Sequence, residues 1–238
     1  MKKYQSIFLF LFFFFFVIII FSVFSLIGNI IYGSISTSSQ NIKINTNINL
    51  IIDPGHGGED GGAIANGVIE KDLNLEISKK LRDFFLLTGI NTHMTRTEDV
   101  LLYKDGQENR KKQHDISNRI QFVNSYENPV LISIHQNKFE IPKYKGLQVY
   151  YSKNHPLGEN LAKIIQNNSK NHLAPENKRE IKAADSKIRL LNSLDVPAVL
   201  VECGFISNQQ EALNLSDQSY QNKLAFILFI SSLAFLEE

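Results

Sequence analysis

Residues 130–135 read VLISIH, and residues 198–202 read AVLVE. Both runs are nearly continuous in aliphatic and β-branched side chains, which is typical of strands covered on both faces. Three further strands are predicted at 49–53, 90–95 and 147–151. Amphipathic helices are predicted from apolar residues three and four apart within four segments, 70–87, 110–125, 156–172 and 220–236. This alternation predicts a three-layer α/β domain with a mixed, mostly parallel central sheet.

The composition is that of a globular protein with a single unusual segment. The chain has 238 residues, is 43% hydrophobic and 21% charged, and carries a formal net charge of +1. These values exclude a disordered chain and argue against a strongly basic nucleic-acid binder, so we expect no nucleic-acid partner. A single cysteine, Cys203, cannot form an internal disulfide. We interpret it as a small buried hydrophobic residue and not as a nucleophile.

The unusual segment is the N-terminus. Residues 7–21 are all apolar, and the run continues with few interruptions to residue 31. A membrane-spanning helix needs about 20 such residues. Lys2 and Lys3 precede the run and predict a cytoplasmic N-terminus with an extracytoplasmic body. We therefore expect a single-pass anchor at 1–33, a Ser/Asn-rich flexible linker at 34–47 and a catalytic domain at 48–238. The alternatives are a cleaved signal peptide, for which the run is long and no cleavage site is evident, and a buried core helix.

Polar residues cluster where the predicted strands end. His56 follows the first strand in DPGHGG, His135 follows VLISI, and Glu202 follows AVLV. The carboxyl ends of strands in such sheets form binding sites, so these side chains are expected at one edge. Glu70 lies on the core-facing stripe of its predicted helix, near the N-terminal end, and is expected to join them. Two imidazoles and a carboxylate suit Zn²⁺, and three protein ligands would leave a fourth position for water.

Each of these residues also has a structural interpretation. His56 could decorate a glycine-rich turn, His135 could be a satisfied core histidine, and Glu70 could be a charge favoured at a helix N-terminus. A purely structural interpretation is harder for Glu202, because burying an ionised carboxylate after four apolar residues costs free energy unless it has a partner or a catalytic role. The remaining histidines do not lie with other polar residues at the end of a predicted strand and are interpreted as structural or surface residues: His93, His114, His155 and His172.

Five stretches resemble the zinc-dependent N-acetylmuramoyl-L-alanine amidases of the Amidase_3 family. They are IIDPGHGGEDGGA (51–63), GVIEKDLNL (67–75), MTRTED (94–99), LISIHQN (131–137) and PAVLVECGFISN (197–208). The resemblance implies a three-layer α/β fold and hydrolysis of the amide between the lactyl group of N-acetylmuramic acid and L-alanine in peptidoglycan. By position, it implies His56, Glu70 and His135 as zinc ligands and Glu202 as the catalytic glutamate.

A finer resemblance concerns biological role. An N-terminal anchor followed by a bare catalytic domain, together with SNRIQFVN (117–124), is similar to the sporulation amidases of endospore-forming bacteria. That resemblance implies removal of peptides so that muramic-δ-lactam forms in the spore cortex, which germination enzymes later recognise. No wall-binding module is evident, so an activating or targeting protein partner is a further expectation. The open alternatives are another peptidoglycan metallohydrolase, either a carboxypeptidase or a deacetylase, and a non-catalytic wall-binding protein.

Overall fold

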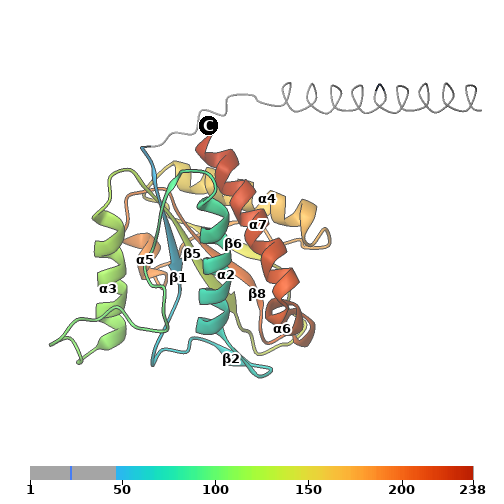
Figure 1. Ribbon diagram of the computed structural model, residues 1–238. Coiled ribbons are helices and arrows are strands. Elements are labelled where there is room, and N and C mark those ends of the chain that lie inside the picture. Colours follow the sequence, from blue (N-terminus) through green and yellow to red (C-terminus); the bar gives the residue numbers. More distant parts are fainter. Residues whose placement is uncertain (1–21, 23–46, 238) are drawn as a thin grey trace, which may run out of the picture. The chain divides into compact units, whose positions relative to one another are not determined.

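A six-stranded mixed sheet forms the middle layer of the fold (Figure 1). Its strands are β1 (Asn49–Pro54), β4 (Asn91–Met94), β5 (Pro129–Asn137), β6 (Gln148–Tyr151), β7 (Lys182–Ala183) and β8 (Ala198–Phe205). They lie in the order β4-β1-β5-β8-β6-β7. β4, β1, β5 and β8 are mutually parallel, whereas β6 runs antiparallel to β8 and parallel to β7. The predicted mixed, mostly parallel sheet is confirmed.

The computed structural model describes residue 22 and residues 47–237. The predicted membrane anchor (1–33) and linker (34–47) therefore lie outside the described residues, apart from Ser22 and Asn47.

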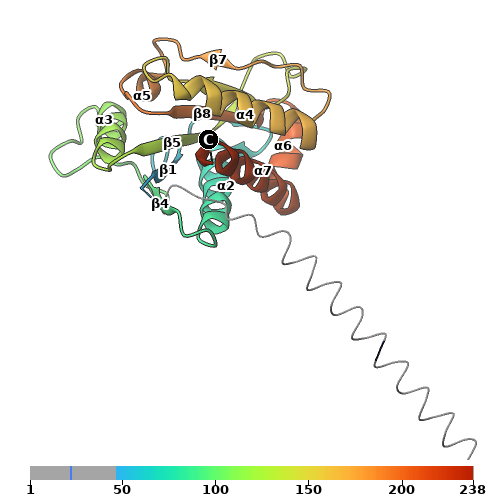
Figure 2. The ribbon, with the colours of Figure 1, turned by 90° about the horizontal axis from the view of Figure 1, so that it is seen from above.

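Helices cover both faces of the sheet, giving three layers. One face packs against α2 (Glu70–Phe85), α4 (Leu157–His172) and α7 (Gln218–Leu236), and the other against α3 (Lys111–Asn124) and α5 (Arg189–Asn192). Figure 2 shows α3 set apart from α2 and α7 across the strands. A short helix, α6 (Gln209–Ser216), connects β8 to α7, and a small hairpin of β2 (Ile64–Ala65) and β3 (Val68–Ile69) precedes α2.

Side-chain alternation along the strands decides which residues face which layer. In β8, Val199 and Val201 join the apolar cluster beneath α2, α4 and α7, whereas Leu200 joins the cluster beneath α3 and α5. Continuing this alternation places Glu202 on the α3/α5 face. Cys203 lies in the cluster on the opposite face.

Two strands are each three residues longer than predicted. β5 and β8 were expected to end at residues 135 and 202, but they continue to Asn137 and Phe205. Pairing carries on past His135 and Glu202 through a register shift, and Asn137 then pairs with Phe205. His135 and Glu202 therefore lie two and three residues before the carboxyl ends of their strands, instead of at the last residue as predicted. The run of apolar residues ends where the hydrophobic core ends, whereas the backbone pairing between the two strands continues beyond that point.

Helix boundaries agree with the sequence pattern to within two residues. α7 begins at Gln218, two residues before the predicted start, because the Asp217 side chain caps it by accepting a hydrogen bond from the Tyr220 backbone N–H. α5, α6, β2, β3 and β7 were not predicted. Except for the eight-residue α6, they are too short to carry a hydrophobic period.

Within the described part of the chain, α7 is the single helix long and apolar enough to cross a membrane. Half of its apolar window is buried in the domain, and α7 packs against α2 and α4. This packing is that of a core helix.

Both ends of the described domain meet at the amino ends of the parallel strands. Asn47, just before β1, and Leu236, at the end of α7, line one open cavity of about 870 Å³. Pro129, which begins β5, and Pro197, which directly precedes β8, line it too.

Candidate metal centre and catalytic site

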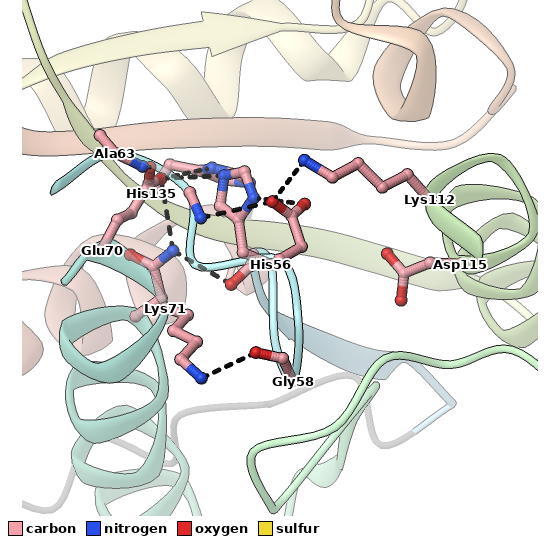
Figure 3. A network of polar contacts seen from close by, with 12 residues as sticks. His56, Gly58, Ala63, Glu70, Lys71, Lys112, Asp115 and His135 are labelled. Atoms are coloured by element: carbon pink, nitrogen blue, oxygen red, sulfur yellow. Dashed lines mark hydrogen bonds and ion pairs between the residues drawn. The ribbon is translucent and has the colours of Figure 1, made fainter. Parts of the chain in front are cut away.

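The candidate site lies at the carboxyl ends of the parallel strands, where β1, β5 and β8 meet the N-terminus of α2. His135 and Glu202 are paired neighbours on β5 and β8, so their side chains leave the same face of the sheet. His56 lies two residues beyond the end of β1, and Glu70 is the first residue of α2. Three of the four residues predicted from the sequence, His56, Glu70 and His135, converge (Figure 3).

Glu70 is the centre of this group. Its side chain is buried, with Oε1 2.9 Å from His135 Nδ1 and 3.3 Å from His56 Nε2. Its carboxylate also accepts hydrogen bonds from the backbone N–H groups of Ala63, at 2.7 Å, and Gln136, at 3.1 Å. Both oxygens are thereby fixed in orientation. A helix N-terminal charge that only faces solvent would make none of these contacts.

Glycines allow the ligand side chains to approach so closely. A Cβ at Gly55 would lie 2.2 Å from the His135 ring, and a Cβ at Gly62 would lie 2.5 Å from Glu70 Oε2. Gly62 also has a φ of +66°, which glycine adopts at little cost. The glycine-rich stretch around His56 is therefore needed to pack the ligands together.

The donor set suits a zinc ion. One candidate ligand atom from each of His56, Glu70 and His135 lies within 4.8 Å of the others. Two imidazole nitrogens and one carboxylate oxygen are ligands that Zn²⁺ accepts in catalytic sites. Burial lowers the pKa of the His56 imidazole, but hydrogen bonds and charge from Glu70 and Asp60 raise it to about 9. The pocket thus favours positive charge between its carboxylates, which a divalent cation would supply.

Asp60 supports His56 and was not predicted from the sequence. Its Oδ2 lies 2.9 Å from His56 Nδ1, and its Oδ1 lies 2.7 Å from Lys112 Nζ. A carboxylate on the second ring nitrogen of a metal-binding histidine fixes the tautomer and the ring orientation. The spacing of four residues in HGGED was the available signal, because a tight glycine turn brings those positions together.

Glu202 lies beside this group without belonging to it. Its Oε2 is buried and has no hydrogen-bond partner among the described residues. Burial is the main cause that raises the pKa of Glu202 to about 7; the charges of His135 and His56 oppose the rise, and that of Glu70 adds to it. An unpartnered carboxylate with a pKa near neutrality can take up and release a proton.

Two buried arginines hold the loop that carries His56. Arg119 pairs with Asp53 and Asp115 and donates a hydrogen bond to the His56 carbonyl at 2.8 Å. Arg96 donates to the Pro54 and Gly55 carbonyls, each at 3.0 Å. These arginines belong to the MTRTED and SNRIQFVN stretches, but no role was predicted for them from the sequence. Apart from Asp115, which is four residues from Arg119, the partners named here are 41–66 residues away in the chain.

The other residues considered from the sequence lie apart from the site. Cys203 is buried on the opposite face of β8, and burial raises the pKa of its thiol well above the usual range. His93 stacks on Tyr126, with ring centroids 4.2 Å apart, and its Nε2 lies 3.2 Å from Asn49 Oδ1. His114, His155 and His172 contribute nothing to the candidate metal centre.

A family model and a known protein match most of this chain. The family model described as N-acetylmuramoyl-L-alanine amidase matches residues 50–227. A germination-specific N-acetylmuramoyl-L-alanine amidase of Bacillus subtilis is 34% identical over 191 residues, which are 79% of this chain and 80% of that protein.

Two solved amidase structures are also similar to this chain. The CwlD amidase of Clostridioides difficile, solved in complex with the GerS lipoprotein, has a TM-score of 0.75 and 38% identity, covering 79% of this chain and 98% of that one. The amidase AmiC2 of Nostoc punctiforme has a TM-score of 0.69 and 27% identity, covering 81% of this chain and 98% of that one.

Proposed function

This chain belongs to the Amidase_3 family of N-acetylmuramoyl-L-alanine amidases, and we propose that it performs that reaction on peptidoglycan with a zinc ion held by His56, Glu70 and His135. The observation that carries the zinc assignment is the convergence of these three side chains on one point, with glycines at the places where a Cβ would block them. The bond cleaved is the amide between the lactyl group of N-acetylmuramic acid and L-alanine.

When bound, Zn²⁺ would polarise the amide carbonyl and lower the pKa of water toward ~7. The residues of the chain do the rest. Asp60 holds the His56 ring with Nε2 directed at the centre, and Ala63 and Gln136 orient the Glu70 carboxylate. Glu202 accepts a proton from the attacking water and delivers it to the departing nitrogen of L-alanine. Its burial favours both steps, because a base with a pKa near the working pH can accept a proton and then release it.

Mass spectrometry of digested peptidoglycan tests this function. We expect the full chain, purified in detergent and loaded with Zn²⁺, to release peptides that begin with free L-alanine, and removal of zinc by a chelator to stop the release. Release of acetate or of C-terminal D-alanine instead would assign a different metallohydrolase activity. Absence of both hydrolysis and zinc binding would refute the proposal.

We further propose that the enzyme acts on spore cortex peptidoglycan, where peptide removal precedes muramic-δ-lactam formation. This is supported by the similarity to the germination-specific amidase of Bacillus subtilis. The test is complementation of a spore-former that lacks its own amidase. Muramic-δ-lactam should reappear among the cortex muropeptides with the native chain and stay absent with a Glu202→Gln variant. Unrestored lactam, in spores that contain the native protein, would contradict the cortex role.

We also propose that residues 1–33 anchor the enzyme in the cell membrane, that 34–47 form a linker and that 48–238 form the catalytic domain on the outer side. An activating or targeting protein partner is supported by the similar CwlD amidase, which was solved with a lipoprotein. Fractionation of cells expressing the full chain tests the anchor. The protein should stay with the membrane after a high-salt wash, and its domain should be open to protease from outside.

A further inference from the structure

A second recognition site adjoins the candidate metal centre. His56 and His135 form part of the wall of a cavity of about 260 Å³ that extends towards α3 and α5. Neither Glu70 nor Glu202 lines it. The cavity therefore adjoins the two imidazoles without including either carboxylate, as a site for a neighbouring part of the substrate would.

The lining of this cavity includes apolar side chains and exposed cations. Its apolar side chains come from α3, from the segment that starts α5 and from β8: Ile116, Ile188, Leu190 and Leu200. Two exposed cations, Lys187 and Arg189, lie beside them. A site of this kind accepts a small aliphatic group together with an anion.

The remaining charges of the cavity are already neutralised within the protein. Arg119 is paired with Asp53 and Asp115, and Lys112 is paired with Asp60. By contrast, neither Lys187 nor Arg189 forms an ion pair with any described residue, and Arg189 makes one long hydrogen bond, from Nη2 to Ser117 Oγ at 3.4 Å. These two cations are therefore free to bind an anionic ligand.

We propose that this cavity binds the stem peptide, with the L-alanine methyl group against its apolar side chains and the free α-carboxylate of the second residue, D-glutamate, on Lys187 and Arg189. This inference rests on the proposed function. The N-acetylated sugars on the other side of the cleaved bond are uncharged, so the peptide is the anionic part of the substrate. The second residue lies about 7 Å from the scissile bond along an extended chain, within reach of a cavity that begins at His56 and His135.

A pair of substrates that differ by one charge tests the assignment. N-acetylmuramoyl-L-Ala-D-Glu carries the carboxylate, and N-acetylmuramoyl-L-Ala-D-isoglutamine carries a neutral amide in its place. We expect the zinc-loaded full chain to prefer the acid by about 10-fold or more in kcat/KM, as a charge-assisted contact would give. In Arg189→Gln and Lys187→Gln the preference should fall towards one. The matched control is Lys182→Gln, an exposed lysine of β7 outside the cavity, which should keep the preference.

A binding measurement separates this proposal from the proposed function. Calorimetry with the product dipeptides, L-Ala-D-Glu and L-Ala-D-isoglutamine, needs no turnover and can be done with and without zinc. Tighter binding of the acid, lost in Arg189→Gln, would support the cavity assignment even if neither substrate were cleaved. The assignment would be overturned if the native protein cleaved the acid and amide substrates equally well and bound the two product dipeptides equally tightly. Variants that weaken both ligands equally would also overturn it.

Discussion

Replacing Asp53 by asparagine removes the charge at the centre of the network that supports the His56 loop. Asp53 is 1% exposed and accepts hydrogen bonds from Ser133 and Thr95, each at 2.6 Å, besides its ion pair with Arg119. Asparagine keeps the shape of the side chain but leaves Arg119, itself 3% exposed, with Asp115 as its remaining carboxylate partner.

The cost follows from the burial of the pair. Removing one partner of a buried ion pair costs about 3–5 kcal/mol. Because Asp115 still pairs with Arg119 in the variant, we expect the free energy of unfolding to fall by about 3 kcal/mol. The pKa of Asp53 gives an independent value. Burial opposes ionisation, but Arg119, Ser133 and Thr95 lower the pKa from 3.8 to about 2. That difference corresponds to about 2 kcal/mol of stability at neutral pH.

Urea unfolding of the compact unit Ile44–Glu238, without metal, measures this cost as a function of pH. Because folding lowers the pKa of Asp53, its contribution is complete above about pH 4 and is lost as the pH falls towards 2. The difference in unfolding free energy between the native protein and Asp53→Asn should therefore decrease over that pH range. Asp83→Asn, at a 59% exposed carboxylate, is the matched control and should change stability by under about 0.5 kcal/mol. A loss below about 1 kcal/mol at pH 7, or a gap that does not narrow in acid, would refute the reasoning.

Three further predictions concern the site. Glu202→Gln should retain zinc, measured by metal analysis of the folded protein, while kcat falls at least about 100-fold; loss of the zinc would show that Glu202 is a ligand. Asp60→Asn should weaken zinc binding about 10- to 100-fold in a chelator competition, because His56 loses its orienting carboxylate; unchanged affinity would remove Asp60 from the site. Gly55→Ala should displace the His135 ring, which a Cβ would approach to 2.2 Å, and so lower zinc occupancy while the unfolding transition stays cooperative; full occupancy would contradict the packing argument.

The three layers of the fold were predictable from the sequence. Continuous apolar strands and amphipathic helices follow from local periodicity, and they predicted the mixed sheet and its two helical layers. The register between strands is a tertiary property, however. The bulge after His135 and the continuation of β8 to Phe205 depend on pairing between segments far apart in the chain, and no local pattern signals them.

The candidate site was predictable where polar residues interrupt apolar runs. His135 and Glu202 stand out because they follow four or more residues that a core would bury. Arg96 and Arg119 do not stand out, since charged residues on loops and helix faces are usually solvated. Their burial becomes evident only when β1 ends beside them and leaves the Pro54 carbonyl to be satisfied.

The cavity shared by Asn47 and Leu236 has a practical consequence. These residues mark both ends of the described domain, and they lie at the amino ends of the strands whose carboxyl ends carry His56 and His135. A fluorescent reporter, an affinity tag or a solid support joined at either end would thus be held on the side of the domain remote from these histidines. Immobilised enzyme prepared either way should keep its full turnover on long glycan strands.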